Sequence, residues 1–350
     1  MTRLTTCQKS SSSTLRPANS AQDVLDLTTG FWISQAIYVA AKLGIADSLR
    51  GGPKSAAELA AMCDVHASSL YRVLRALASL QIFAENAEGK FALTPAAECL
   101  TTDESGSLRA YAIMMGEQWV WRSCGEMLHS VRSGRSGFEH VFGAPVFDYW
   151  QSHPESAGLS AEGLSSRGAA ENFAVIAAYP FPKTGTVVDI GGGQGTLLGS
   201  VLTGNPGLHG LLFDLPHVVK TAEPLLQRAN VRSRCNLLSG NFFSSIPSEG
   251  DVYILKKVIH DWPDEQARII LKNCREAIPE HGRLLLIELV IPDGNEPSFG
   301  KMLDLLMLAY AGGRERTQTE YRDLLVSAEF RLQRTVSTAS PVSIMEAVPI

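Results

Sequence analysis

Residues 187–195 read Val-Val-Asp-Ile-Gly-Gly-Gly-Gln-Gly, and this stretch decides the fold of the carboxy-terminal half of the chain. Its apolar start predicts a buried strand, and its glycines predict a tight turn before a helix that begins near Thr196. Asp214 ends the next strand-like run about 20 residues on, where a carboxylate accepts hydrogen bonds from a ribose diol. Strand, turn, helix, strand and acid in this order predict a binding site for a nucleotide-type ligand.

Strand-like and helical runs alternate along the sequence from residue 186 onward. The predicted strands are residues 186–190, 210–214, 234–238, 251–255 and 283–290, and helices are predicted over 216–227, 263–277 and 317–328. This alternation predicts a doubly wound α/β fold around a parallel sheet. Extended segments at 331–336 and 342–348 add a terminal antiparallel hairpin. The glycine spacing G-x-G-x-G differs from the G-x-G-x-x-G of dinucleotide sites, which disfavours a dinucleotide.

A winged helix is predicted between residues 51 and 100. Helices over 55–62 and 67–80 precede two short strands at 82–84 and 90–93. Helix-turn-helix modules of this kind bind DNA, but this one carries four basic residues against five acidic ones. Because phosphate binding needs a basic surface, we interpret the module as a protein-interaction domain.

The remaining segments are assigned from composition and apolar spacing. Residues 1–20 are Ser-rich and are predicted to form a disordered tail. Large apolar side chains recur at helical spacing over residues 21–50, where they serve either the core or, as we favour, a subunit interface. The predicted domains are the tail at 1–20, a winged-helix domain at 21–104, a helical pocket or linker region at 105–180, and a ligand-binding domain at 181–350.

The overall composition argues against several classes of protein. The 36 acidic and 31 basic residues give a formal charge of -5, which disfavours binding to nucleic acid or to anionic lipid. The six cysteines are scattered without a CxxC pair, so we predict reduced thiols, no metal site and a cytoplasmic location. Neither a signal peptide nor a membrane-spanning segment is predicted.

A second group of residues is suited to proton transfer. His260 lies within the stretch 251–266, just after the fourth predicted strand, on the side where open α/β sheets bind ligands. Glu288 ends the fifth strand, and Glu315 lies in a glycine-containing loop expected at the same rim. An imidazole between two carboxylates can be oriented and made more basic. Pro263 is expected at the first position of the following helix.

Five motifs in order give the chain a specific resemblance to a known family. They are VVDIGGGQG, LLFDLPHVV, GNFFSSIP, LKKVIHDWPDEQ and GGRERTQTEY. Together they resemble the S-adenosylmethionine-dependent O-methyltransferases typified by plant caffeate and flavonoid enzymes, with bacterial mitomycin- and phenazine-type relatives. The resemblance runs from about Asp23 to the end of the chain. It implies a Rossmann-like methyltransferase sheet and a winged-helix domain that forms a homodimer with a second copy.

The resemblance also implies roles for individual residues. His260 matches the general base, and Glu288 and Glu315 match the acids that bracket it. The expected cofactor-binding residues are Asp189, Gly191, Gly193, Gly195, Asp214, Leu215, Asn241, Phe242, Lys256 and Trp262. Aromatic and methionine side chains suit an ordinary core as well as a pocket for a flat apolar ligand. The expected substrate-binding residues are Met114, Trp119, Phe147, Asp261 and Met307.

One expected cofactor residue departs from the family pattern. The family usually has Asp where Asn241 stands, in contact with the adenine amino group. The amide oxygen of Asn still accepts that hydrogen bond, so binding of S-adenosylmethionine is expected to persist. The segment 155–173 matches the family's substrate wall poorly, which leaves the acceptor unidentified.

The sequence as a whole predicts methyl transfer from S-adenosylmethionine to a hydroxyl, expected to be phenolic, of a small aromatic, natural-product-like acceptor, with S-adenosylhomocysteine as product. A phenol with a pKa of ~10 is mostly neutral at neutral pH, so His260 is expected to remove its proton. Three alternatives remain open. They are N-methylation of a heteroaromatic acceptor, which needs no base, a nicotinamide-dependent oxidoreductase, and a non-catalytic regulator with the same fold.

Overall fold

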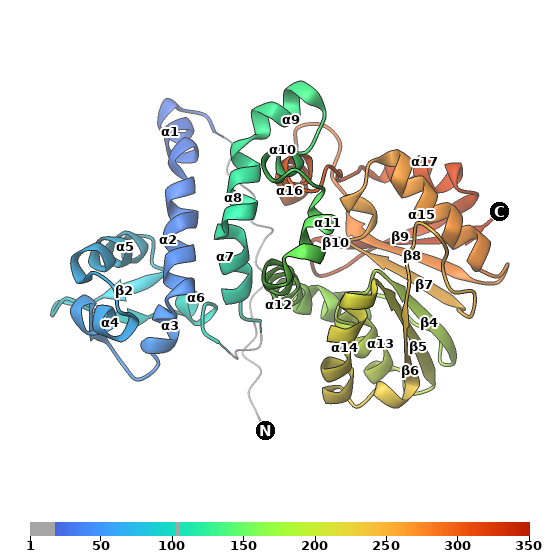
Figure 1. Ribbon diagram of the computed structural model, residues 1–350, viewed down its shortest axis with the longest axis horizontal. Helices are drawn as coiled ribbons and strands as arrows, with labels where there is room; N and C mark the ends of the chain where they lie inside the picture. The colour runs from blue at the N-terminus through green and yellow to red at the C-terminus, as the bar shows by residue number, and fades with distance from the viewer. Residues whose placement is uncertain (1–17, 103–105) are drawn as a thin grey trace. The chain divides into compact units, whose positions relative to one another are not determined.

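A computed structural model describes residues 18–102 and 106–350, and these divide into two compact units (Figure 1). The helical unit comprises residues 19–132 and 137–170. The sheet unit comprises residues 133–136 and 171–350. Most of the predicted tail at 1–20 lies outside the described residues, although Ser20 is described and caps the first helix by accepting from the Asp23 amide.

The sheet unit is built on seven strands in the order β6-β5-β4-β7-β8-β10-β9. Their bounds are β4 Gly185–Ile190, β5 Leu208–Asp214, β6 Cys235–Ser239, β7 Val252–Lys256, β8 Arg283–Leu289, β9 Phe330–Ser337 and β10 Val342–Pro349. The first five strands pair in parallel, and β10 pairs antiparallel with both β8 and β9. The predicted parallel sheet with a terminal antiparallel hairpin is confirmed.

Helices cover both faces of this sheet, as Figure 1 shows for the sheet unit. They are α13 Thr196–Gly204, α14 Pro216–Arg228, α15 Asp264–Ala277, α16 Phe299–Ala309, α17 Gln318–Ser327 and the end of α12 Pro154–Ala178. Val187 packs with α13 and α14, whereas its neighbour Val188 packs with α15 and α17 in a separate hydrophobic cluster. Consecutive strand residues point to opposite faces, so continuous apolar strands are buried on both sides.

One helix begins later than expected. Pro263 was predicted at the first helical position of α15, but it is the residue that precedes the helix. Its ψ of 163° is extended, so helical dihedral angles begin at Asp264. The acidic residues Asp264 and Glu265 still occupy the first turn, where they stabilise the helix dipole.

The amino-terminal part of the helical unit is the predicted winged helix. Its elements are α3 Ile45–Ser48, β1 Lys54–Ser55, α4 Ala56–Cys63, α5 Ala67–Ser79, β2 Phe83–Glu85, β3 Lys90–Leu93 and α6 Pro95–Glu98. Ser55 and Glu58 form a capping box that begins α4. Leu74, Leu77 and Phe91 are fully buried and join α5 to the three-stranded sheet β1-β3-β2.

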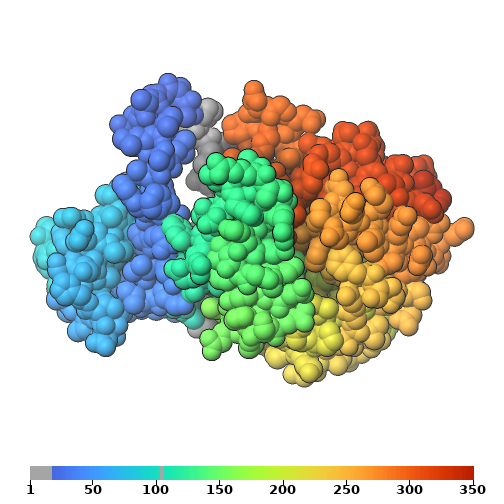
Figure 2. Space-filling view, turned by 45° about the horizontal axis from the view of Figure 1, so that its top comes forward, coloured from blue at the N-terminus to red at the C-terminus, as the bar shows by residue number. Residues whose placement is uncertain are grey.

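Helices make up the rest of this unit. They are α1 Ala21–Thr29, α2 Phe31–Lys42, α7 Arg109–Gly116, α8 Gln118–Gly125, α9 Met127–Ser133, α10 Gly137–Phe142 and α11 Val146–Ser152. Large apolar side chains of α1 and of the start of α2 are exposed, including Leu25 at 56% and Trp32 at 63%. Figure 2 shows α1 and the start of α2 (dark blue) standing away from α4 and α5 (light blue). No described helix is long and apolar enough to span a membrane.

Candidate active site

In the structure, the glycine turn is hydrogen-bonded to Asp214, the acid that the sequence places after the next strand. Gly191, Gly193 and Gly195 all have positive φ, between 58° and 72°, which favours glycine. The amide of Gly193 donates to Oδ2 of Asp214 at 2.8 Å, and the amide of Leu215 donates to Oδ1 at 2.7 Å. The turn after β4 and the end of β5 therefore form one polar rim at the carboxyl edge of the sheet.

This rim has the features of a binding site for a polar ligand. A Cβ placed on Gly193 would meet no atom within 4 Å, so the backbone there faces open space. Asp189, at the end of β4, is 1% exposed, and its Oδ2 has no hydrogen-bond partner among the described residues. Burial raises the pKa of Asp189 to about 7, although Lys256 opposes this shift. An open backbone turn and an unpaired buried carboxylate oxygen suit a ligand that brings hydrogen-bond donors or positive charge.

Lys256 is held by residues that sequence reasoning missed. Its Nζ donates to Oδ1 of Asn172 at 2.5 Å and lies 3.4 Å from a carboxylate oxygen of Glu171. The same Asn172 donates to the hydroxyl of Thr196 at 3.1 Å, where α13 begins. Burial lowers the pKa of Lys256, while Glu171 opposes that shift. Glu171 and Asn172 stand in a helical stretch with no local motif, so nothing in their spacing could have indicated this role.

An aromatic group follows β6. The rings of Phe242 and Trp262 lie 6.0 Å apart, and those of Phe243 and Trp262 lie 4.7 Å apart. Oδ1 of Asn241 accepts from the amide of Phe243 at 2.9 Å, which shapes the turn. Asn273 on α15 donates to the carbonyl oxygen of Phe242 at 2.7 Å. The structure thus brings Trp262 beside Phe242, which precedes it by 20 residues in the sequence, while Asn241 adjoins Phe242 in the turn.

His260 and the two predicted acids also converge. His260 lies in the 3-10 turn η2 Ile259–Asp261, is 7% exposed, and its Nδ1 is 2.7 Å from Oε1 of Glu315. Oε1 of Glu288 accepts from the amides of Val258 and Ile259, at 3.2 and 2.9 Å. Glu288 therefore fixes the backbone that carries His260, whereas Glu315 binds the imidazole itself.

The surrounding carboxylates control the charge of the imidazole. Burial alone lowers the pKa of His260, but Asp261, Glu288 and Glu315 outweigh burial and raise the pKa to about 9. The charge of Asp261 is the largest single cause that raises this pKa, and its Oδ1 lies 3.5 Å from Nε2 of His260. Burial raises the pKa of Glu288 to about 7. The group is built to stabilise a protonated imidazole.

A second loop packs directly on the His260 turn. The amide of Arg314 donates to the carbonyl oxygen of His260 at 2.8 Å, and a Cβ on Gly313 would collide with that same oxygen. The amide of Glu315 donates to Oδ1 of Asp304 on α16 at 2.7 Å. The loop 312–317 is thereby held by the backbone of His260 before Glu315 and by the side chain of Asp304 at Glu315 itself.

His260, Glu288 and Glu315 also offer donor atoms that lie within 4.8 Å of one another, a spacing that a metal ion can bridge. The direct bond between His260 and Glu315 and the two amides on Glu288 already engage Nδ1 and one oxygen of each carboxylate in hydrogen bonds, whereas Oε2 of Glu288 and Oε2 of Glu315 have no hydrogen-bond partner among the described residues. We therefore interpret the cluster as an acid–base group, and the expected lack of a metal stays a prediction.

The expected substrate-binding residues are divided between the two units. Met114, Trp119 and Phe147 lie on α7, α8 and α11 of the helical unit, and Met114 and Trp119 are buried there. Asp261 adjoins His260, and Met307 is buried on α16 in the sheet unit. Their convergence on one pocket stays a prediction.

Comparison with known proteins identifies the fold and its chemistry. Residues 124–331 match an O-methyltransferase domain, and residues 25–103 match an O-methyltransferase dimerisation domain. The chain belongs to the O-methyltransferase family. Its donor is S-adenosylmethionine, the methyl donor of this family and a ligand in solved structures of its members. The match to a dimerisation domain also indicates self-association.

Three members indicate how close the relationship is. A phenazine O-methyltransferase from Lysobacter antibioticus is 45% identical over 93% of this chain and 96% of its own length. A phenazine-1-carboxylate N-methyltransferase from Pseudomonas aeruginosa is 30% identical over 90% of this chain and 93% of its own. A crystal structure of an O-methyltransferase from neocarzinostatin biosynthesis, with S-adenosylmethionine and 2-hydroxy-5-methyl naphthoic acid bound, has a TM-score of 0.82 at 30% identity and covers 95% of this chain and 100% of that one.

Proposed function

We propose that this O-methyltransferase methylates a phenolic hydroxyl of a small aromatic, natural-product-like acceptor, with His260 as general base. The observation that carries the proposal is the buried hydrogen bond from Nδ1 of His260 to Glu315. It leaves Nε2 as the ring nitrogen able to accept a proton. The relatives named for phenazine and naphthoic acid compounds support an aromatic acceptor.

The sheet unit has the donor and acceptor groups that S-adenosylmethionine requires. We assign the amino-acid part of the cofactor to Asp189 and the glycine turn, because the unpaired carboxylate oxygen suits an ammonium group. Asp214 would accept the ribose hydroxyls, and Asn241, Phe242 and Trp262 would surround the adenine. When bound, S-adenosylmethionine supplies an electrophilic methyl group on a positively charged sulfur.

His260 makes the acceptor oxygen nucleophilic by taking its proton. A phenol with a pKa of ~10 and an imidazole with a pKa of about 9 exchange a proton at little cost. The proton moves to Nε2, and Glu315 stabilises the imidazolium through Nδ1. Glu288 holds the backbone of the His260 turn through two amides, so the ring keeps its direction.

Methylation of a nitrogen is the second candidate. The relative from Pseudomonas aeruginosa named as an N-methyltransferase supports it. A nitrogen lone pair needs no deprotonation, so that reaction would leave His260 without a task. Because the buried His260–Glu315 pair has a clear use in O-methylation, we favour the hydroxyl. Membership of the family gives no support to the oxidoreductase and regulator alternatives.

An acceptor screen tests the proposal. The enzyme would be incubated with methyl-labelled S-adenosylmethionine and with hydroxyphenazines, 1,4-dihydroxy-2-naphthoic acid or 3-amino-4-hydroxybenzoate, together with their N-only analogues. We expect label on a phenolic oxygen, located by NMR of the product, and the same rate in excess EDTA. Label only on nitrogen, or loss of activity in EDTA that a divalent metal restores, would contradict the proposal.

We also assign a role to each predicted domain. Residues 21–104 would form a homodimer, residues 105–180 would contribute one wall of the acceptor pocket, and residues 181–350 would bind the cofactor and carry the base. The exposed apolar residues of α1 and α2 support the first assignment. The aromatic side chains of α8 and α11 support the second.

A further inference from the structure

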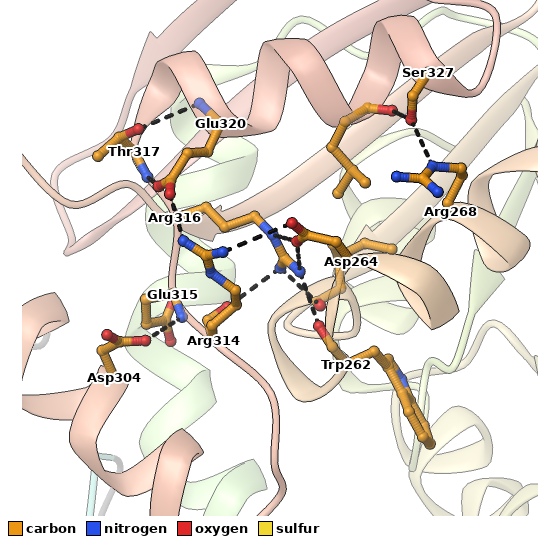
Figure 3. Close-up of polar contacts among 12 residues, drawn as sticks. Trp262, Asp264, Arg268, Asp304, Arg314, Glu315, Arg316, Thr317, Glu320 and Ser327 are labelled. Atoms are coloured by element: carbon orange, nitrogen blue, oxygen red, sulfur yellow. Dashed lines mark hydrogen bonds and ion pairs between the residues drawn. The ribbon is translucent and has the colours of Figure 1, made fainter. Parts of the chain in front are cut away.

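Arg316 is one residue beyond Glu315, and its side chain is only 1% exposed. Its guanidinium is engaged on all three nitrogens, as Figure 3 shows. Nε and Nη2 both donate to Oδ1 of Asp264, at 3.0 and 2.7 Å. Nη2 also donates to the carbonyl oxygen of Trp262 at 2.8 Å, and Nη1 to those of Ile259 and Arg314, at 3.1 and 3.2 Å.

The atoms that accept hydrogen bonds from Arg316 lie close to His260 and Glu315 in the sequence. Ile259 begins the turn that carries His260, Trp262 directly follows that turn, and Asp264 begins α15 just beyond it. Arg314, in turn, directly precedes Glu315 in the second loop. One planar guanidinium thus binds the backbone on both sides of His260 and stands beside the backbone that carries Glu315. Because the guanidinium of Arg316 is planar and rigid, its hydrogen bonds fix the distance between the turn that carries His260 and the loop that carries Glu315.

Arg316 forms an ion pair with Asp264, and this pairing keeps the Asp264 carboxylate ionised. Burial raises the pKa of Asp264, but the hydrogen bonds from Arg316 together with the positive charges of Arg316, Arg314 and Arg268 lower it below its ordinary value. An ionised partner stabilises the buried guanidinium and holds it against the three carbonyl oxygens. The ring of Tyr321 on α17 lies 5.9 Å from the guanidinium carbon and adds an aromatic neighbour.

We propose that Arg316 is a positioning residue, which sets the hydrogen bond between Nδ1 of His260 and Oε1 of Glu315 by tying their two loops together. We assign it no contact with the acceptor or the methyl donor, so it acts only through His260 and Glu315. The proposal deepens the proposed function, since its effect on turnover assumes that His260 is the base. Its effect on the His260–Glu315 pair does not depend on that assumption.

Arg316→Lys tests the proposal, because it keeps the positive charge and removes the rigid fork. The first measurement is the pKa of His260, followed by NMR of its ring carbons and assigned with a His260→Ala variant. The charged groups that face His260 are Asp261, Glu288 and Glu315, and this substitution alters none of them. In Arg316→Lys the contact between His260 and Glu315 should loosen. We therefore expect the pKa of His260 to fall by about one unit, which is about tenfold in proton affinity.

The second measurement separates binding from turnover. With the acceptor found by the screen, we expect Arg316→Lys to lower kcat by about 10- to 100-fold. The KM of the acceptor and the Kd of S-adenosylhomocysteine, measured by calorimetry, should stay within about twofold. Arg268→Lys is the matched control. Arg268 joins α15 to α17 through Ser327 but contacts neither loop, so this variant should match the wild type in all three quantities.

The outcomes are distinct. A lower Tm with an unchanged pKa of His260 and an unchanged kcat would overturn the proposal and leave Arg316 a purely structural residue. If Arg316→Lys does not fold, Asp264→Asn replaces it, since the side chain of Asp264 is half exposed, and a smaller fall in the same pKa is expected. If Arg316→Lys lowers the pKa of His260 but His260→Ala is fully active, the result supports the positioning role of Arg316. It contradicts the assignment of His260 as general base.

Discussion

The two ring nitrogens of His260 have different environments, and this difference defines the site at the scale of the residue. Nδ1 is bonded to the buried carboxylate of Glu315, whereas Nε2 lies 3.5 Å from Oδ1 of Asp261 and is the nitrogen to which the proposed function assigns proton exchange. Three acids raise the pKa of the imidazole to about 9. A base must be unprotonated to act, so the active fraction of a free enzyme with this pKa grows as the pH rises toward 9.

The pH dependence of turnover follows from that shift. We expect kcat/KM to rise about tenfold per pH unit on its acid side and to level near pH 9, not near the ordinary histidine value of ~6.5. Glu315→Gln keeps a hydrogen-bond acceptor but removes the charge, so the pKa of His260 falls and the acid limb moves to lower pH. A pH–rate profile of both proteins measures this.

The control for Glu315→Gln is a second charge-removing variant, Glu265→Gln, measured in the same pH–rate experiment. Glu265 is an exposed acid in the first turn of α15, and Glu265→Gln removes one negative charge without touching His260. It should leave the acid limb where the wild type has it. An identical limb in Glu315→Gln and the wild type would show that Glu315 does not govern the titration.

Part of the site could be predicted from sequence because it follows strand ends. His260 follows β7 and Glu288 lies at the end of the neighbouring parallel strand β8, and such strand ends meet at one edge of a sheet. Arg316 could not be predicted, because its partners are mainly backbone carbonyl oxygens, which carry no sequence signal. Glu171 and Asn172 were missed for a related reason, since they contact Lys256 across more than 80 residues of sequence.

At the scale of the element, the site depends on two loops that pack backbone against backbone. The loop 312–317 contacts the turn of His260 through the amide of Arg314 and the bare Cα of Gly313. A strand bridge between Val290 and Arg316 holds the far side of the loop. The two loops therefore act as one platform.

Gly313→Ala should push the loop 312–317 away from the turn that carries His260. Its Cβ would collide with the carbonyl oxygen of His260, which is backbone and cannot rotate away. We expect a loss of about 1–3 kcal/mol in unfolding free energy and at least about a tenfold loss in kcat. Denaturant unfolding and steady-state kinetics measure the two effects.

Gly158→Ala is the matched control for that substitution. Gly158 lies inside α12, and a Cβ there meets nothing within 4 Å. Alanine is the better helix former by about 1 kcal/mol, so this variant should be as stable as the wild type or more so. A Gly313→Ala protein that behaves like Gly158→Ala would contradict the role of the close contact.

The elements themselves were predicted unevenly. The five parallel strands were predicted because apolar runs buried on both faces stand out between glycine and charged segments. Helix α16 was not predicted, since Leu305 and Met302 are exposed apolar residues that obscure its polar face. The start of α15 was predicted one residue early because Pro is accepted on either side of a helix boundary.

At the scale of the whole molecule, the chain combines a sheet unit, to which we assign the catalytic group, and a helical unit whose residues 25–103 match a dimerisation domain. The winged helix lacks the positive charge that nucleic acid requires, and its neighbours α1 and α2 expose large apolar side chains. Exposed apolar surface of this kind is characteristic of a subunit interface.

The oligomeric state tests this assignment. We expect the wild type to elute as a dimer of the 37.8 kDa chain in size-exclusion chromatography with light scattering. Leu25→Glu together with Trp32→Glu should yield a monomer, because both side chains are more than half exposed on α1 and α2. Val326→Glu alters an equally exposed residue on α17 and should leave the dimer intact. A dimer that survives the double substitution would place the interface elsewhere.

The most direct test of the central claim is a comparison of catalysis and cofactor affinity in His260→Ala. His281→Ala, which removes an exposed histidine from the same unit, serves as the control. We expect His260→Ala to lower kcat by about 10²- to 10⁴-fold while the Kd of S-adenosylhomocysteine stays within about twofold of the wild type. Comparable losses of turnover and affinity, or a fully active variant, would contradict the assignment of His260 as the base.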